Sequence, residues 1–211
     1  MPFSLSPVNG RFVGQWLRVA LGLLLASSDS AATFTWSQGS GNWDTTTSNW
    51  TGLTWNNSSN AAVFGGTAGS TITIATTGIQ ATSLTFNVNG DTIAGSVSNN
   101  LTLLGASNFI SIGSGLSATI SAPLAGTQGL TKTGAGTLIL TAASNPYTGA
   151  TTMEGGSIVA RGTQSSTALT LKGSTFTLDA GAGGTLPSST ALSVGSIAFG
   201  KGTFIFDNTT A

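Results

Sequence analysis

Cysteine and histidine are absent from this chain of 211 residues, and only six acidic and six basic residues are present. Without cysteine the chain forms no disulfide, and without histidine it lacks the commonest acid–base and metal-binding side chain. The formal net charge is zero and no basic stripe is visible, so nothing electrostatic indicates a nucleic-acid partner. Between residues 45 and 131 the only charged residue is Asp91. We therefore expect no bound metal and no cofactor.

The sequence is instead rich in glycine, with 30 residues, and in serine, threonine and β-branched residues. Low charge combined with this hydrophobicity argues against disorder, and it is typical of short strands separated by turns of small residues. No useful helical periodicity follows residue 32. Strands are predicted at Thr71–Ile74, Ser83–Val88, Asn100–Leu104, Phe109–Ile112, Ser117–Ile120, Thr137–Leu140, Ser157–Ala160, Ala168–Leu171, Thr175–Leu178, Ala191–Val194 and Thr203–Phe206.

The N-terminal segment, 1–32, has the three parts of a signal peptide. Arg11 and Arg18 precede a short apolar run over residues 19–26, and small residues follow at Ser30–Ala32. The apolar run is far shorter than the ~20 residues that a membrane-spanning helix needs. We predict export with cleavage after Ala32 and no membrane span afterwards; an uncleaved interfacial anchor is the alternative.

A regular recurrence of glycine and short strands is the main signal of architecture. Gly136 and Gly156 are each followed by a hydroxyl residue and an apolar strand. Such a recurrence, at a period of roughly 20 positions, is typical of a solenoid. A column of apolar residues at nearly even spacing supports it: Leu84, Leu101, Ile120, Leu140, Ile158, Phe176 and Val194. We predict an all-β, right-handed parallel β-helix over residues 65–211; a β-sandwich is the alternative.

Residues 33–64 differ from the rest, because they contain four of the five tryptophans: Trp36, Trp43, Trp50 and Trp55. Exposed indoles in a row would stack on sugar rings. Buried indoles would instead cap the end of a solenoid, which otherwise exposes apolar surface and unpaired strand edges. The cap is the favoured interpretation, and the four tryptophans are also the candidate ligand-binding residues.

Catalytic chemistry finds little support in the residues. Glycoside hydrolysis needs two carboxylates that face one cleft, and only Asp179 and Asp207 follow strands whose stacking would bring them together. Both positions are typical of turn residues. No histidine is available to activate a serine, and no metal-ligand cluster is present. We predict a protein without enzymatic activity.

Residues 120–160 resemble the autotransporter-associated β-strand repeat. The resemblance lies in the glycine-flanked strand GAGTLIL, the turn NPYTG and the following GGSI, and the positions that define it are Gly134, Gly136, Leu138, Leu140, Asn145, Tyr147, Gly149, Gly156 and Ile158. It implies a right-handed β-helical passenger or stalk that is exported and displayed beyond the outer membrane. The chain as given stops at residues 207–211 with no room for a C-terminal translocator barrel, and we expect its C-terminal end to be truncated.

We expect a structural scaffold, secreted or at the surface of a bacterium, with surface polysaccharides or other surface proteins as partners. A carbohydrate-binding module that uses the tryptophans is the alternative, and a polysaccharide-acting enzyme is less favoured. An uncapped solenoid end would also pair edge to edge with another copy.

Overall fold

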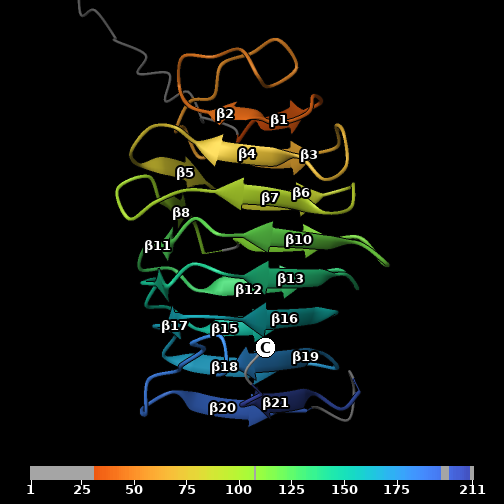
Figure 1. Cartoon of the computed structure of the whole chain (residues 1–211), viewed down its shortest axis with the longest axis vertical. Helices are drawn as coiled ribbons and strands as arrows, with labels where there is room; N and C mark the ends of the chain where they lie inside the picture. The colour runs from red at the N-terminus through yellow and green to blue at the C-terminus, as the bar shows by residue number, and fades with distance from the viewer. Residues whose placement is uncertain (1–30, 107, 196–199, 210–211) are drawn as a thin grey trace, which may run out of the picture.

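A computed structural model describes residues 31–106, 108–195 and 200–209, and the predicted signal peptide lies outside these residues except for its last two positions. The described residues form a stack of coils in which strands alternate between two eight-stranded sheets (Figure 1). Sheet A contains β1 (Thr33–Trp36), β3 (Ala61–Phe64), β6 (Ser83–Phe86), β9 (Phe109–Ile112), β12 (Leu130–Thr133), β15 (Thr151–Met153), β18 (Ala168–Leu171) and β20 (Ala191–Val194). Sheet B contains β2 (Gly41–Trp43), β4 (Thr71–Ile74), β7 (Asp91–Ala94), β10 (Ser117–Ile120), β13 (Thr137–Leu140), β16 (Ser157–Ala160), β19 (Thr175–Asp179) and β21 (Thr203–Asp207).

A third side of the stack is built from shorter strands in two separate groups. One group contains β5 (Ile79–Ala81), β8 (Leu101–Leu103) and β11 (Leu124–Ala125), and the other contains β14 (Ser144–Asn145) and β17 (Thr163–Gln164). The strand predicted at Asn100–Leu104 contains β8 and is confirmed. The other four were not predicted, because two or three residues are too few to show a period.

Every strand of the two large sheets pairs in parallel with the strand one coil away, as β13 does with β10 on one side and β16 on the other. This arrangement confirms the predicted parallel β-solenoid. The β-sandwich alternative fails, since its sheets are antiparallel.

Side chains alternate between core and surface along each strand, as the pleat of a strand requires. In β13, Leu138 and Leu140 are 0% and 1% exposed, whereas Ile139 is partly exposed between them. Each buried leucine contributes roughly 1.5–3 kcal/mol of hydrophobic stabilisation. The predicted inward direction of Leu138 and Leu140 is confirmed.

The apolar column predicted from the spacing is wrong in its membership. Leu84 lies in sheet A, Leu101 on the third side and Ile120 in sheet B. The column that contains Ile120 in sheet B is Ile93, Ile120, Leu140, Ala160, Leu178 and Phe206. Successive members are unevenly spaced along the chain, because the turns between sheets differ in length from coil to coil.

Candidate functional site

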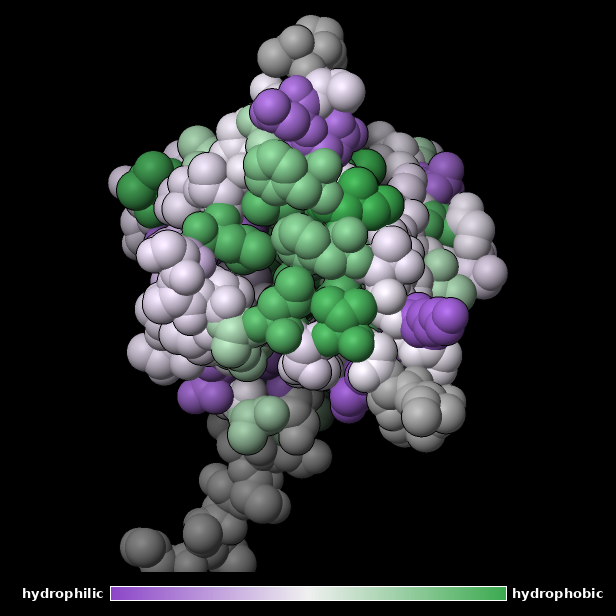
Figure 2. Space-filling model, turned by 90° about the horizontal axis from the view of Figure 1, so that it is seen from below, coloured by the Kyte–Doolittle hydropathy of each residue, from purple (hydrophilic) through white to green (hydrophobic). Residues whose placement is uncertain are grey.

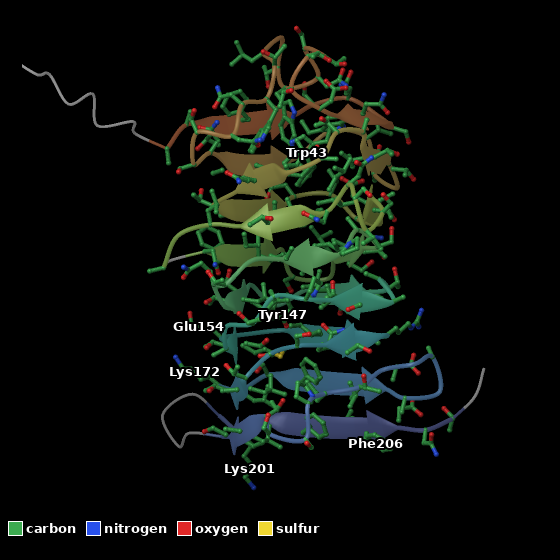
Figure 3. The ribbon with its side chains drawn as sticks, turned by 90° about the vertical axis from the view of Figure 1, so that its left-hand side faces the viewer. Trp43, Tyr147, Glu154, Lys172, Lys201 and Phe206 are labelled. Carbon is green, nitrogen blue, oxygen red and sulfur yellow. The ribbon has the colours of Figure 1, made fainter. Side chains whose placement is uncertain are left out.

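The four tryptophans proposed as ligand-binding residues lie inside the β1–β2 end of the solenoid. Trp36, Trp43 and Trp50 are 0% exposed and Trp55 is 1% exposed. Their rings meet edge to face, with centroids 5.0 Å apart for Trp43 and Trp50 and 5.2 Å apart for Trp36 and Trp50. Figure 3 shows Trp43 within this coil. Such aromatic pairs add about 0.5–1.5 kcal/mol each beyond the area that they bury.

Two of the four indole nitrogens find polar acceptors. Trp36 Nε1 donates to the carbonyl oxygen of Gly39 at 2.9 Å, and Trp55 Nε1 donates to Asn57 Oδ1 at 3.1 Å. Trp43 Nε1 and Trp50 Nε1 have no hydrogen-bond partner among the described residues, and both rings sit in edge-to-face contact with other aromatic rings. Since all four side chains are enclosed, their burial favours the cap interpretation over a row of indoles that stacks on sugar rings.

The loop of residues 44–60, which carries Trp50 and Trp55, also covers the backbone of the first coil. Thr51 Oγ1 donates to the carbonyl oxygen of Thr35 in β1, and Asn49 Nδ2 donates to that of Asn42 in β2, both at 2.7 Å. Thr51 has a φ of 49°, a conformation that threonine seldom adopts. The side chains of this loop therefore satisfy carbonyls that an edge strand would leave unpaired.

The glycines of the repeat lie where coils approach one another. Gly134 and Gly156 have φ of 72° and 66°, and a Cβ atom on either would overlap a carbonyl oxygen of the preceding coil. Gly136 and Gly149 also leave no space for a Cβ atom beside the neighbouring coil's backbone. The core between these corners is filled by apolar side chains of the repeat, Leu138, Leu140 and Ile158. The structure thus brings the predicted repeat positions together as one coil and its contact with the next.

Lys132 is fully buried at an inward position of β12, and sequence reasoning missed it. Its Nζ donates to the carbonyl oxygens of Thr133 and Gly134 at 2.7 and 2.9 Å, and to that of Gly155 at 3.5 Å. The ammonium therefore joins the turns of two successive coils. Burial lowers the pKa of Lys132 to about 8. The signal was available, because alternation places Lys132 on the same side of its strand as Leu130.

A buried polar cluster occupies the third corner of the repeat. Tyr147 Oη lies 2.8 Å from Thr151 Oγ1, which donates to Ser166 Oγ at 3.0 Å. Burial raises the pKa of Tyr147 to about 12, because the phenolate would be desolvated. These hydroxyls satisfy one another and tie the repeat to the following coil.

Asn145 lies at the same corner, where its side chain provides the acceptor for a backbone N–H of the preceding coil. Its Oδ1 accepts the backbone N–H of Leu124 in the preceding coil at 2.9 Å. Gln164 lies in register with Asn145 on the next strand, and both side chains are buried. Asn145 Nδ2 and Gln164 Oε1 have no partner among the described residues, and they are a donor and an acceptor on neighbouring strands.

The two carboxylates considered for catalysis lie on paired strands, but each bonds to other groups. Asp179 and Asp207 are register partners on β19 and β21. Asp179 forms an ion pair with Arg161 at 2.9 Å and accepts the N–H of Ala182 at 3.1 Å. Hydrogen bonds from Thr209 hold the pKa of Asp207 below its usual value. A glycosidase pair needs one carboxyl kept protonated; Asp207, with its lowered pKa, does not supply it, and Asp179 is held in an ion pair with Arg161.

Within the residues that the structure describes, no group of three or more potential metal-ligating side chains is found. The same residues include no helix with the length and hydrophobicity that crossing a membrane requires.

Comparison with known proteins finds a family model that matches the central coil. The sequence of residues 130–160, which contains β12 to β16, matches the passenger-associated-transport-repeat family. The corner glycines, Lys132 and Tyr147 lie within the matched residues, whereas Ser166 lies beyond them.

The chain is also similar to the adhesin BmaC autotransporter of Brucella suis biovar 1 (strain 1330), with 39% identity over 168 residues. The aligned part covers 74% of this chain and 4% of the adhesin, so the chain spans a small fraction of that relative. No solved structure gives a significant match. Together with the solenoid, the transport repeat and this relative confirm the resemblance that the sequence showed.

Proposed function

We propose that this chain is a non-catalytic segment of an exported bacterial surface protein, in which the solenoid acts as a passenger-type scaffold. The observation that carries the proposal is the transport repeat, which is continuous with the coils on both sides of it. Similarity to an autotransporter adhesin supports a place at the cell surface. A stack of coils in contact only with their neighbours is suited to holding other segments away from the membrane.

Surface display tests this proposal. A short epitope inserted between Ser114 and Gly115, in the exposed turn from β9 to β10, should leave the sheets intact. In bacteria that express the complete reading frame, antibody should bind this epitope on intact cells. Labelling that appears only after permeabilisation would contradict the proposal.

The enzymatic alternative has no geometric support from the described carboxylates, since Asp179 is paired with Arg161 and Asp207 bonds to Thr209. Purified protein should therefore release no reducing ends from polysaccharides. Cleavage that is lost in Asp179→Asn or Asp207→Asn would overturn the proposed non-catalytic role.

A further inference from the structure

A groove of about 450 Å³ opens on the third side of the solenoid, where the two groups of short strands meet. Its lining comes from the segments that follow β7, β10 and β13, on the turns between sheet B and the third side. Beside the groove the backbone ladder between β11 and β14 is interrupted, because Leu124 N bonds to the Asn145 side chain and Pro146 has no N–H to donate. The ladder resumes where Tyr147 N donates to the carbonyl oxygen of Leu124. The volume of the groove falls within the ~300–1,000 Å³ of small-molecule sites.

The lining of this groove combines hydroxyl and amide groups with apolar surface. The polar side chains are those of Ser96, Asn100, Ser121 and Ser144, and the apolar surface includes Val97, Pro123 and Pro146. Val97 is 86% exposed on the loop that borders the groove. Ser96 Oγ accepts the N–H of Asn99, Asn100 Nδ2 donates to the carbonyl oxygen of Val97, and Ser121 Oγ donates to that of Ile93. The remaining donors and acceptors of these groups and the hydroxyl group of Ser144 are what the groove offers a ligand.

Among the described residues, no charged side chain lines the groove. The surrounding chain is equally neutral, because Asp91 is the only charged residue from 45 to 131 and is itself 1% exposed. A charged ligand would lose its hydration here without gaining a counter-charge. An uncharged ligand with many hydroxyl groups loses far less.

We propose that this groove binds a short stretch of uncharged polysaccharide. A sugar ring presents C–H groups on its faces and hydroxyl groups around its rim, which matches apolar Val97 and proline surface beside serine and asparagine side chains. This inference rests on the proposed function, because a protein at the cell surface is exposed to polysaccharides. It places the ligand site at the groove, away from the buried tryptophans.

The experiment introduces the same charge at two exposed alanines, one inside the groove and one outside it. Ala143 lines the groove, whereas Ala150 lies outside it, and both are exposed. Purified wild type, Ala143→Lys and Ala150→Lys are run on native gels that contain dextran, mannan or, as a polyanion, alginate. At least one neutral polysaccharide should retard wild type and Ala150→Lys equally. Ala143→Lys should bind at least tenfold more weakly, with an unchanged melting temperature.

Retardation should not change between about 0.05 and about 0.5 M NaCl, because no ion pair takes part. The proposal is overturned if neither neutral polysaccharide retards the protein, if both variants lose binding equally, or if alginate binds best. Binding of an extended peptide by a protein that binds no sugar would also overturn it. Epitope display on cells is measured separately, so failure of retardation with intact display removes only the groove proposal.

Discussion

At the β1–β2 end of the solenoid the core is covered by the loop of residues 44–60, whereas no loop among the described residues covers it at the β20–β21 end. Trp50, from that loop, is 0% exposed, while Phe206 in β21 is 62% exposed. Figure 2 shows the β20–β21 end as an apolar patch surrounded by polar surface, and Leu192 and Val194 contribute to it with exposures of 51% and 45%. The covering loop therefore accounts for the burial of the core at the β1–β2 end.

The largest effect should come from comparing the same substitution, to aspartate, at two positions of one column that lie in different coils. Leu140 and Phe206 share a column of sheet B, but Leu140 is 1% exposed. Leu140→Asp buries an unpaired charge at a cost of several kcal/mol, roughly the whole stability of a domain. Phe206→Asp should cost less than about 1 kcal/mol. Thermal melting should show an unfolded Leu140→Asp and a folded Phe206→Asp.

Ile139→Thr serves as the control in the central coil, because Ile139 lies on the outward side of β13 and is partly exposed. It should melt close to wild type. Equal damage from Leu140→Asp and Ile139→Thr would refute the alternation in β13.

Removing one ring from the covering loop should be the next largest change. Trp50→Ala deletes a fully buried indole from the cluster, and we expect a loss of about 3–5 kcal/mol. Phe206→Ala removes an exposed ring at the other end and should cost less than about 1 kcal/mol. Urea unfolding of both variants measures the difference, and similar midpoints would show that the cap does not stabilise the fold.

Lys132 in the interior can be compared with Lys201, which is exposed near the β20–β21 end. The pKa of Lys132 falls from 10.5 to about 8 on folding, so between these values the unfolded chain binds more protons and stability should rise with pH. The gain approaches about 2 kcal/mol from pH ~8 to ~10. Above pH ~10, Tyr147 opposes it, because its pKa is raised to about 12 in the folded protein.

Urea midpoints at pH 8 and pH 10 provide the measurement for this prediction. Glu154 and Lys172, in the coils that follow, pair with each other at 3.1 Å (Figure 3). Lys132→Met should abolish the rise, whereas Lys201→Met should retain it. A rise that survives in Lys132→Met would assign it to another group.

The smallest effect concerns association of the 211-residue chain. Leu53 in the covering loop and Phe206 at the β20–β21 end are similarly exposed, at 57% and 62%. Because the β20–β21 end combines apolar surface with unpaired strand edges, we propose self-association there. Phe206→Asp should weaken it roughly tenfold, about 1.4 kcal/mol, and Leu53→Asp should not. Light scattering over a dilution series measures this; monomeric wild type throughout would rule it out.

Much of the fold was predictable because its strands carry a clear pattern. The predicted strands Thr137–Leu140 and Ser157–Ala160 have the observed limits, and the repeat glycines lie at real corners. The strands of the third side at Ser144–Asn145 and Thr163–Gln164 were missed, since they contain no apolar residue. Carbohydrate binding by the tryptophans stays a prediction, with their burial weighing against it.

The sequence alone determined a parallel stack of coils, because alternation within strands and a regular recurrence of glycine corners admit few other ways to bury the apolar side chains. Only the tertiary structure decided which residues share a column, since the turns between sheets vary in length. It also decided that four tryptophans face inward, that Lys132 is enclosed by carbonyl groups, and that a neutral groove opens beside Pro146. Each of these depends on contacts between coils, which lie far apart along the chain.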